Sequence, residues 1–80
     1  MIQIQPYKAT DKDILATQLE IHTENLTELT VDAVWFLYDD AGQYVNDGRM
    51  QLAGDDFIAY LSDNEYAIDY IINQKGIIKI

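Results

Sequence analysis

The stretch from Ala33 to Tyr38 constrains the fold more than any other part of the sequence, because every residue in it is apolar or aromatic. It lies in the segment from Leu29 to Tyr38, which we predict to be the strongest β-strand of the chain. Side chains along a strand point alternately to opposite faces, so this strand has two apolar faces that both need cover. A chain of 80 residues holds one core, so we expect residues 1–80 to form a single domain.

A turn and a returning strand are predicted next. Asp39-Asp40-Ala41-Gly42 combines aspartates with a glycine that can adopt a positive φ, and Gln43 to Leu52 has the character of a hairpin partner. Within it, Asn46-Asp47-Gly48 indicates either a bulge or a second tight turn, and both stay open. At the start of the chain, Met1 to Gln5 alternates as a short edge strand, which Pro6 should end because proline has no N–H to donate.

The segment from Ile14 to Thr23 fits two patterns. One is the alternation of a strand, carried by Leu15, Thr17, Leu19 and Ile21. The other is the spacing of a helix that begins at Thr10-Asp11-Lys12-Asp13, carried by Ile14, Leu15, Gln18, Leu19 and His22. The β-branched residues favour the strand, and the helix is the alternative.

Two helical segments are predicted after the return strand. Ala53-Gly54-Asp55-Asp56 ends that strand, and its aspartates favour a short helical turn at Phe57 to Leu61. Ser62-Asp63-Asn64-Glu65 then has the form of a capping box, with Leu61 and Tyr66 placed to act as its hydrophobic staple.

The second helix should run from Asp63 to Lys75. Its apolar residues have the spacing needed to pack on a sheet: Ala67, Ile68, Ile71 and Ile72. Gly76 should end it in the left-handed conformation so that Ile77 packs back on Ile72, and Ile77 to Ile80 should form a short last strand. The predicted fold is therefore α+β: a small antiparallel β-meander with a C-terminal helix, made of a short turn and one longer helix, packed on one face.

Charge excludes several partners. The formal net charge is −9, and no Lys or Arg occurs between Asp13 and Asn46. A nucleic-acid or anionic membrane surface needs a basic stripe, so we expect no direct nucleic-acid or membrane binding. The chain has no cysteine for a disulfide or a thiolate zinc site. The N-terminus has no basic, apolar signal sequence, so we expect no secretion by a signal peptide.

Catalytic, cofactor and metal sites are not expected. His22 is the only imidazole, and nothing marks a partner for it in general acid–base chemistry. Ser62 is the only serine and is explained as a cap. The pairs Asp39-Asp40 and Asp55-Asp56, with Asp47, could in principle bind Ca²⁺, but turn and cap chemistry explains them more simply. We therefore predict a protein that is not an enzyme.

The doubly apolar strand indicates a binding surface instead. Trp35 or Phe36, depending on register, should pack under the helix, and the other should meet a partner or be covered by loops and the first strand. Tyrosine is enriched at interfaces, and several tyrosines recur along the helical segment, where they could equally flank the core. The predicted interface residues are Trp35, Phe36, Tyr38, Tyr60, Tyr66 and Tyr70.

The part from Trp35 to Ile80 resembles small accessory and structural proteins of tailed bacteriophages, chiefly virion accessory or assembly proteins. The resemblance lies in the aromatic strand with its Asp-Asp-x-Gly turn, in Leu52-x-Gly54-x-Asp56-Phe57, and in Asp69-Tyr70-Ile71-Ile72 followed by Gly76-Ile77. It implies a non-enzymatic part of a particle, present in many copies or as a homo-oligomer, that contacts itself or a larger capsid, neck or tail protein. The expected location is then the virion or the host cytoplasm.

Two other functions stay open. The long run without a basic residue also suits an acidic inhibitor that imitates nucleic acid, of the anti-restriction or anti-CRISPR type, which would bind a basic protein. A small adaptor in a cellular complex is the third possibility. The virion component is the function we expect first.

Overall fold

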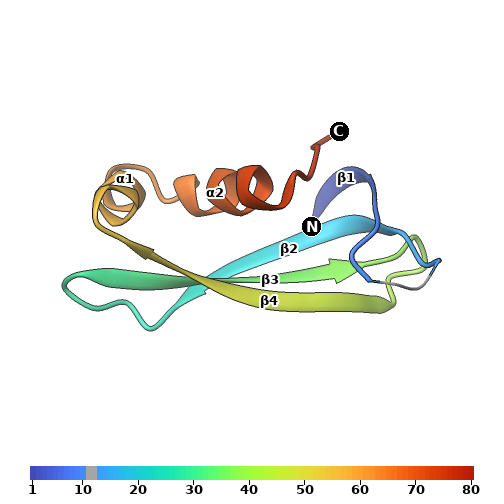
Figure 1. The fold of residues 1–80 in the computed structure, drawn as a ribbon, viewed down its shortest axis with the longest axis horizontal. Helices are drawn as coiled ribbons and strands as arrows, with labels where there is room; N and C mark the ends of the chain where they lie inside the picture. The colour runs from blue at the N-terminus through green and yellow to red at the C-terminus, as the bar shows by residue number, and fades with distance from the viewer. Residues whose placement is uncertain (11–12) are drawn as a thin grey trace.

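The computed structural model describes residues 1–10 and 13–80, and in it two helices lie on one side of an antiparallel sheet (Figure 1). The four strands, β1 (Ile2–Tyr7), β2 (Ala16–Glu24), β3 (Thr30–Tyr38) and β4 (Tyr44–Ala53), follow the order of the chain across the sheet. The helices are α1 (Asp55–Ser62) and α2 (Tyr66–Lys75). The molecule is elongated, with extents of 40 × 21 × 19 Å. The predicted α+β meander with helices on one face is confirmed.

Residues Ala16–Glu24 form a strand, so the helix alternative for this part of the chain is wrong. β2 lies between β1 and β3, where Leu19 is opposite Leu37 and Ile21 is opposite Trp35. Because β2 pairs with a strand on each side, its backbone N–H and C=O groups are hydrogen-bonded within the sheet. The start predicted for that helix includes residues 11 and 12, which lie outside the described residues.

The alternation of β3 decides which of its aromatic side chains faces the helices. Its odd-numbered residues are buried in the core: Val31, Ala33, Trp35 and Leu37. Trp35 is 7% exposed, and Lys75 Nζ of α2 lies 4.4 Å from the centre of its ring. Phe36 therefore lies on the opposite face, which resolves the register that the sequence left open.

β4 contains a bulge and no second turn. Leu37 is opposite Asn46 while Tyr38 is opposite Tyr44, so Val45 is the extra residue. Gly48 is opposite Trp35, and a Cβ atom added to it would lie 2.1 Å from Trp35 Cζ2. This glycine therefore makes room for the indole ring.

The junction between the helices differs from the prediction. Ser62 belongs to α1, and its hydroxyl donates to the Ile58 carbonyl at 3.3 Å. Asp63 is extended, its N–H donates to the Ala59 carbonyl, and its Oδ1 accepts the Glu65 N–H at 3.0 Å. The predicted capping box is therefore wrong, because Asp63 ends α1 and α2 begins only at Tyr66.

The predicted hydrophobic staple is also absent from this junction. Leu61 is 58% exposed, while Tyr66 is partly buried beside the core. A staple forms only across a cap, and no side-chain cap precedes α2.

The end of α2 agrees with the prediction. Gly76 has φ 69° and ψ 27°, and the Ile77 N–H donates to the Ile72 carbonyl at 3.0 Å. Ile72 and Ile77 are both buried in the core. The predicted last strand is present as a single bridge between Ile4 and Lys79 along the outer edge of β1.

β1 runs one residue beyond Pro6, with an irregular register between Gln3 and Tyr7. Proline is tolerated at such an irregular edge position because the missing N–H interrupts no regular ladder.

Candidate functional site

The sheet face opposite the helices, which we call the open face, carries no helix, and Figure 1 shows both helices on the other side. It consists of side chains that alternate with the buried ones along β2, β3 and β4. The strand pairing places these residues there: Gln18, Glu20, His22 and Glu24; Asp32, Val34, Phe36 and Tyr38; Tyr44, Asp47, Arg49 and Gln51. The open face is therefore built mainly from three strands.

The first strand and Ala9, in the segment after it, do not cover this face either. β1 is a strand of the sheet itself, so it cannot form a second layer. After β1, the Ala9 carbonyl accepts a hydrogen bond from Asn46 Nδ2 at 3.2 Å. Asn46 is opposite the buried Leu37, and directly opposed residues share a face, so Ala9 lies on the helix side. The alternative that the first strand covers the second apolar side of β3 is thus wrong, because β1 lies in the plane of the sheet.

The middle of the open face is apolar. Val34, Phe36 and Tyr38 follow one another along β3, and all three are partly buried by their neighbours. The His22 ring from β2 meets Phe36 edge-on, with 6.1 Å between centroids and 68° between planes. His22 also pairs with Glu20 on the same strand. The centre of the open face thus has an aromatic side chain with an imidazole ring at its border.

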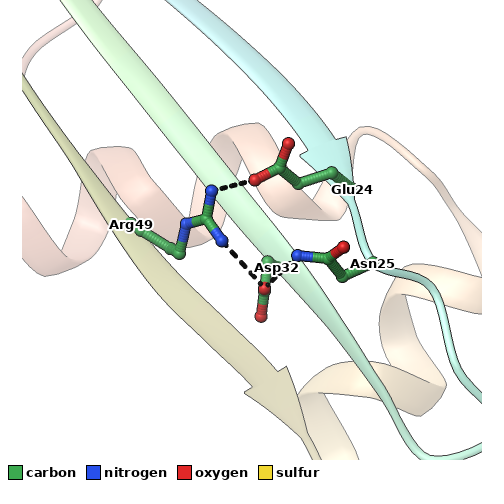
Figure 2. A network of polar contacts seen from close by, with 4 residues as sticks. All are labelled: Glu24, Asn25, Asp32 and Arg49. Carbon is green, nitrogen blue, oxygen red and sulfur yellow. Dashed lines mark hydrogen bonds and ion pairs between the residues drawn. The ribbon is translucent and has the colours of Figure 1, made fainter.

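A network of polar contacts lies at the end of the open face nearest α1 (Figure 2). Arg49 of β4 reaches across β3, where one guanidinium nitrogen binds Glu24 and another lies 3.4 Å from Asp32 Oδ2. Asn25 Nδ2 donates to the same Asp32 oxygen at 3.0 Å. Such exposed pairs contribute only about 0–1 kcal/mol each, so the network mainly fixes how the side chains are presented.

The other end of the open face is organised by a turn. The Asp39 carboxylate accepts the N–H groups of Ala41 and Gln43, each at 2.9 Å, and Gly42 has φ 79°. Thr17 donates to Asp40 at 2.6 Å. The Asp39 carboxylate thus stabilises the turn, as the sequence indicated, and the Asp40 carboxylate joins the turn to β2.

Tyr44 stands at the same end and is 58% exposed. Partial desolvation of its hydroxyl, followed by the charge of Asp47 and a hydrogen bond with it, raises the pKa of Tyr44. The side chain is mostly in water, so the neighbouring Asp47 carboxylate is a more effective cause than burial.

The six predicted interface residues do not form one surface. Trp35 and Tyr60 belong to the core, with 7% and 8% exposure, so the prediction that they meet a partner is not supported. Tyr60 instead lies 3.2 Å from the Thr23 hydroxyl, which joins α1 to β2. Both rings are buried because they lie on the helix side of the sheet, where the apolar core forms.

The remaining four residues divide into two pairs. Phe36 and Tyr38 share the open face. Tyr66 and Tyr70 lie together on α2, with ring centroids 6.2 Å apart, and pack beside the core as the sequence alternative allowed. Only Phe36 and Tyr38 are therefore candidates for one common binding surface.

The sequence pattern did not reveal that charged residues surround Phe36. Arg49 meets Glu24 and Asp32 only because β4, β3 and β2 are neighbours. Polar residues recur at every second position along β2 and β4, on the face opposite the buried residues. This alternation could have identified the charged group from the sequence.

Within residues 1–10 and 13–80, the structure shows no pocket and no group of three or more His, Cys, Asp or Glu that could hold a metal ion. In the same residues, neither helix has the length and apolar character to cross a membrane. Comparison with models of protein families, with curated proteins and with solved structures finds no match.

Proposed function

We propose that this protein is a non-enzymatic interaction protein that binds another protein through the open face of its sheet. The observation that carries the proposal is the position of Phe36, in the middle of the sheet face opposite both helices. An apolar centre bordered by charged and polar side chains is the usual arrangement of a protein–protein interface.

The size of the open face limits the kind of interface. β2 and β3 have nine residues each, strands rise about 3.3 Å per residue, and neighbouring strands are about 4.8 Å apart. Three strands then present roughly 400–450 Å², about half of the ~800 Å² that each partner buries in a standard interface. We therefore propose binding that is either modest in strength or repeated over many copies.

A virion offers such repetition. The resemblance of the aromatic strand and its turn, from Trp35 to Gly42, to tailed-phage accessory proteins supports a structural or assembly role in a particle. In this proposal the partner is a larger capsid, neck or tail protein, and Phe36 with Tyr38 forms the contact. The charge of −9 supports protein over nucleic acid as the partner.

The test compares two variants in purified particles of the phage that, under this proposal, encodes the chain. Phe36→Thr introduces a β-branched residue, which suits a strand, and removes the ring from the open face. Ile58→Thr changes a side chain that is 61% exposed on α1 and serves as the matched control. We expect the wild-type chain and Ile58→Thr in purified particles, measured by quantitative mass spectrometry, and at least a tenfold loss of Phe36→Thr.

Circular dichroism and urea unfolding must show that both variants are folded. Equal incorporation of folded Phe36→Thr, or absence of the wild-type chain from particles, would contradict the proposal.

The acidic inhibitor remains a second candidate because carboxylates outnumber cations on the open face. Glu20, Glu24, Asp32 and Asp47 lie there with Arg49 as the one guanidinium. This function predicts that the protein competes with DNA for a basic nuclease and that added salt weakens the competition. A protein that fails to compete at low salt with any nuclease of its host does not have this function.

A further inference from the structure

The two outer edges of the sheet differ in whether another segment of the chain is hydrogen-bonded to them. At the β1 edge, the Gln5 N–H donates to the Ile78 carbonyl at 2.8 Å, and the Ile80 N–H donates to the Gln3 carbonyl at 3.1 Å. Residues after α2 therefore occupy the middle of this edge. β4, with ten residues, has β3 on one side and no strand on the other among the described residues. An edge of this length exposes a row of backbone donors and acceptors.

The charges on β4 have an unusual arrangement for such an edge. Charged residues commonly protect edge strands because a second copy would bring like charges together. In β4, Asp47 and Arg49 flank Gly48 on the same face and have opposite signs. In an antiparallel copy centred on Gly48, each Asp47 is opposite Arg49 of the second copy, so two attractive pairs form. The edge is self-complementary in that register.

We propose that β4 is the dimerisation edge of this protein and that its occupant is the β4 strand of a second copy. The two strands run antiparallel about Gly48, with Asp47 opposite Arg49 of the second copy and Asn46 opposite its Met50. Opposed residues share a face, so the open faces of both copies lie on the same side of one continuous sheet. The surface proposed above for partner binding is thereby doubled.

Asp47 of the second copy competes with Glu24 and Asp32 for Arg49. The Arg49 guanidinium lies across β3, on the side away from the free edge, where it binds Glu24 and Asp32. These exposed pairs are weak and the Arg49 side chain is 53% exposed, so it can turn to Asp47 of the second copy. The net charge of −9 opposes association, but at about 0.15 M salt the Debye length is about 8 Å. Opposed side chains about 5 Å apart interact inside that length.

The experiment measures self-association by sedimentation equilibrium with two charge reversals. Arg49→Asp and Asp47→Arg each place two like-charged pairs at the edge, and each should raise the dimer dissociation constant about tenfold or more. A mixture of the two variants restores opposite charges at both positions and should form a heterodimer. The double variant D47R/R49D should self-associate like the wild-type chain.

Two controls change the charge by the same amounts at exposed residues away from β4. Lys79→Asp, at the β1 edge, matches Arg49→Asp, and Glu28→Arg matches Asp47→Arg. Both should leave the dissociation constant within about twofold of the wild type. Rescue in the mixture excludes misfolding as the cause of the loss, since an unfolded variant cannot be rescued by a second one.

Three outcomes would overturn the proposal: a wild-type chain that is monomeric at every concentration, a dimer that neither reversal weakens, or a mixture that forms no heterodimer. Dimers lost in Phe36→Thr would also overturn it, because self-association would then use the open face. A monomer with an intact open face leaves the proposed function in place, so the two failures are distinguishable.

Discussion

Gly48 and Trp35 fit closely against each other on neighbouring strands. The indole ring occupies the place where a side chain of the opposing strand would stand, since a Cβ at Gly48 would lie 2.1 Å from Cζ2 and 2.3 Å from Cη2. The buried indole Nε1 has no hydrogen-bond partner among the described residues. Trp35 is therefore stabilised by packing and by Lys75, which lies over its ring. Because the indole N–H makes no hydrogen bond, replacing Trp35 by a smaller aromatic residue would remove none.

Gly48→Ala should destabilise the fold by about 1–3 kcal/mol, because the ring must move away from the new methyl group. The cost should be smaller in a Trp35→Phe background, where the smaller ring leaves room. Urea unfolding of the two single variants and the double variant measures this coupling, and Gln51→Ala on the same strand is the control. Equal costs in both backgrounds would contradict the steric explanation.

The contact between Tyr66 and Asp56 gives a pH dependence. The Tyr66 hydroxyl donates to Asp56 Oδ1 at 2.6 Å, and this hydrogen bond is the main reason why the pKa of Tyr66 is raised above 10.0. The stabilisation depends on the protonated phenol. It is complete below the unfolded-state pKa and is lost as the pH rises through the higher folded-state pKa.

The wild-type chain should therefore be more stable than Tyr66→Phe near neutral pH, and this difference should shrink as the pH rises above about 10. Urea midpoints of both proteins at neutral and strongly alkaline pH provide the measurement. A difference that is independent of pH would show that the phenol proton does not contribute.

At the scale of elements, helix ends illustrate when local rules hold. Gly76 ends α2 as expected because its left-handed conformation depends only on its own backbone and the turn before it. The start of α2 was predicted three residues too early, because Asp63 bonds backward to α1 and forward to Glu65 and so cannot cap α2. A capping pattern between two adjacent helices does not say which helix its residues will join.

Gly76→Ala should cost about 1–2 kcal/mol, since a Cβ is strained at φ 69°. Gly76→Asn should cost less, because asparagine tolerates this region. Thermal unfolding of the two variants tests this order. Equal stability of Gly76→Ala and the wild type would mean that α2 ends in another way.

At the scale of the whole molecule, charge opposes compactness. With 14 acidic and 5 basic side chains, the folded state brings like charges closer than the unfolded chain does. Raising the salt concentration from about 0.01 M to about 0.1 M shortens the Debye length from about 30 Å to about 10 Å. The melting temperature should therefore rise by several degrees.

Glu28→Lys provides the comparison for this prediction. Glu28 is exposed, and its reversal brings the net charge from −9 to −7. The melting temperature of this variant should depend less on salt than that of the wild type. A melting temperature that falls with salt would show instead that ion pairs such as those of Arg49 outweigh the general repulsion.

The sequence by itself determined the features that depend on neighbouring residues. The apolar run from Ala33 to Tyr38 is a strand, Asp39 to Gly42 is a turn, and Gly76 ends the last helix. Each of these rests on local backbone conformation or on composition that only one kind of element suits. The α+β class followed from their order along the chain.

Tertiary structure alone decided the features that depend on segments far apart in the chain. Pairing with β1 and β3 made Ala16–Glu24 a strand, and register placed Trp35 under the helices and Phe36 outside. The same register brought Arg49 to Glu24 and Asp32. A shift of one residue would reverse every one of these faces, and no local pattern specifies that shift. Long-range packing therefore determined which aromatic side chain of the doubly apolar strand is left on the open face.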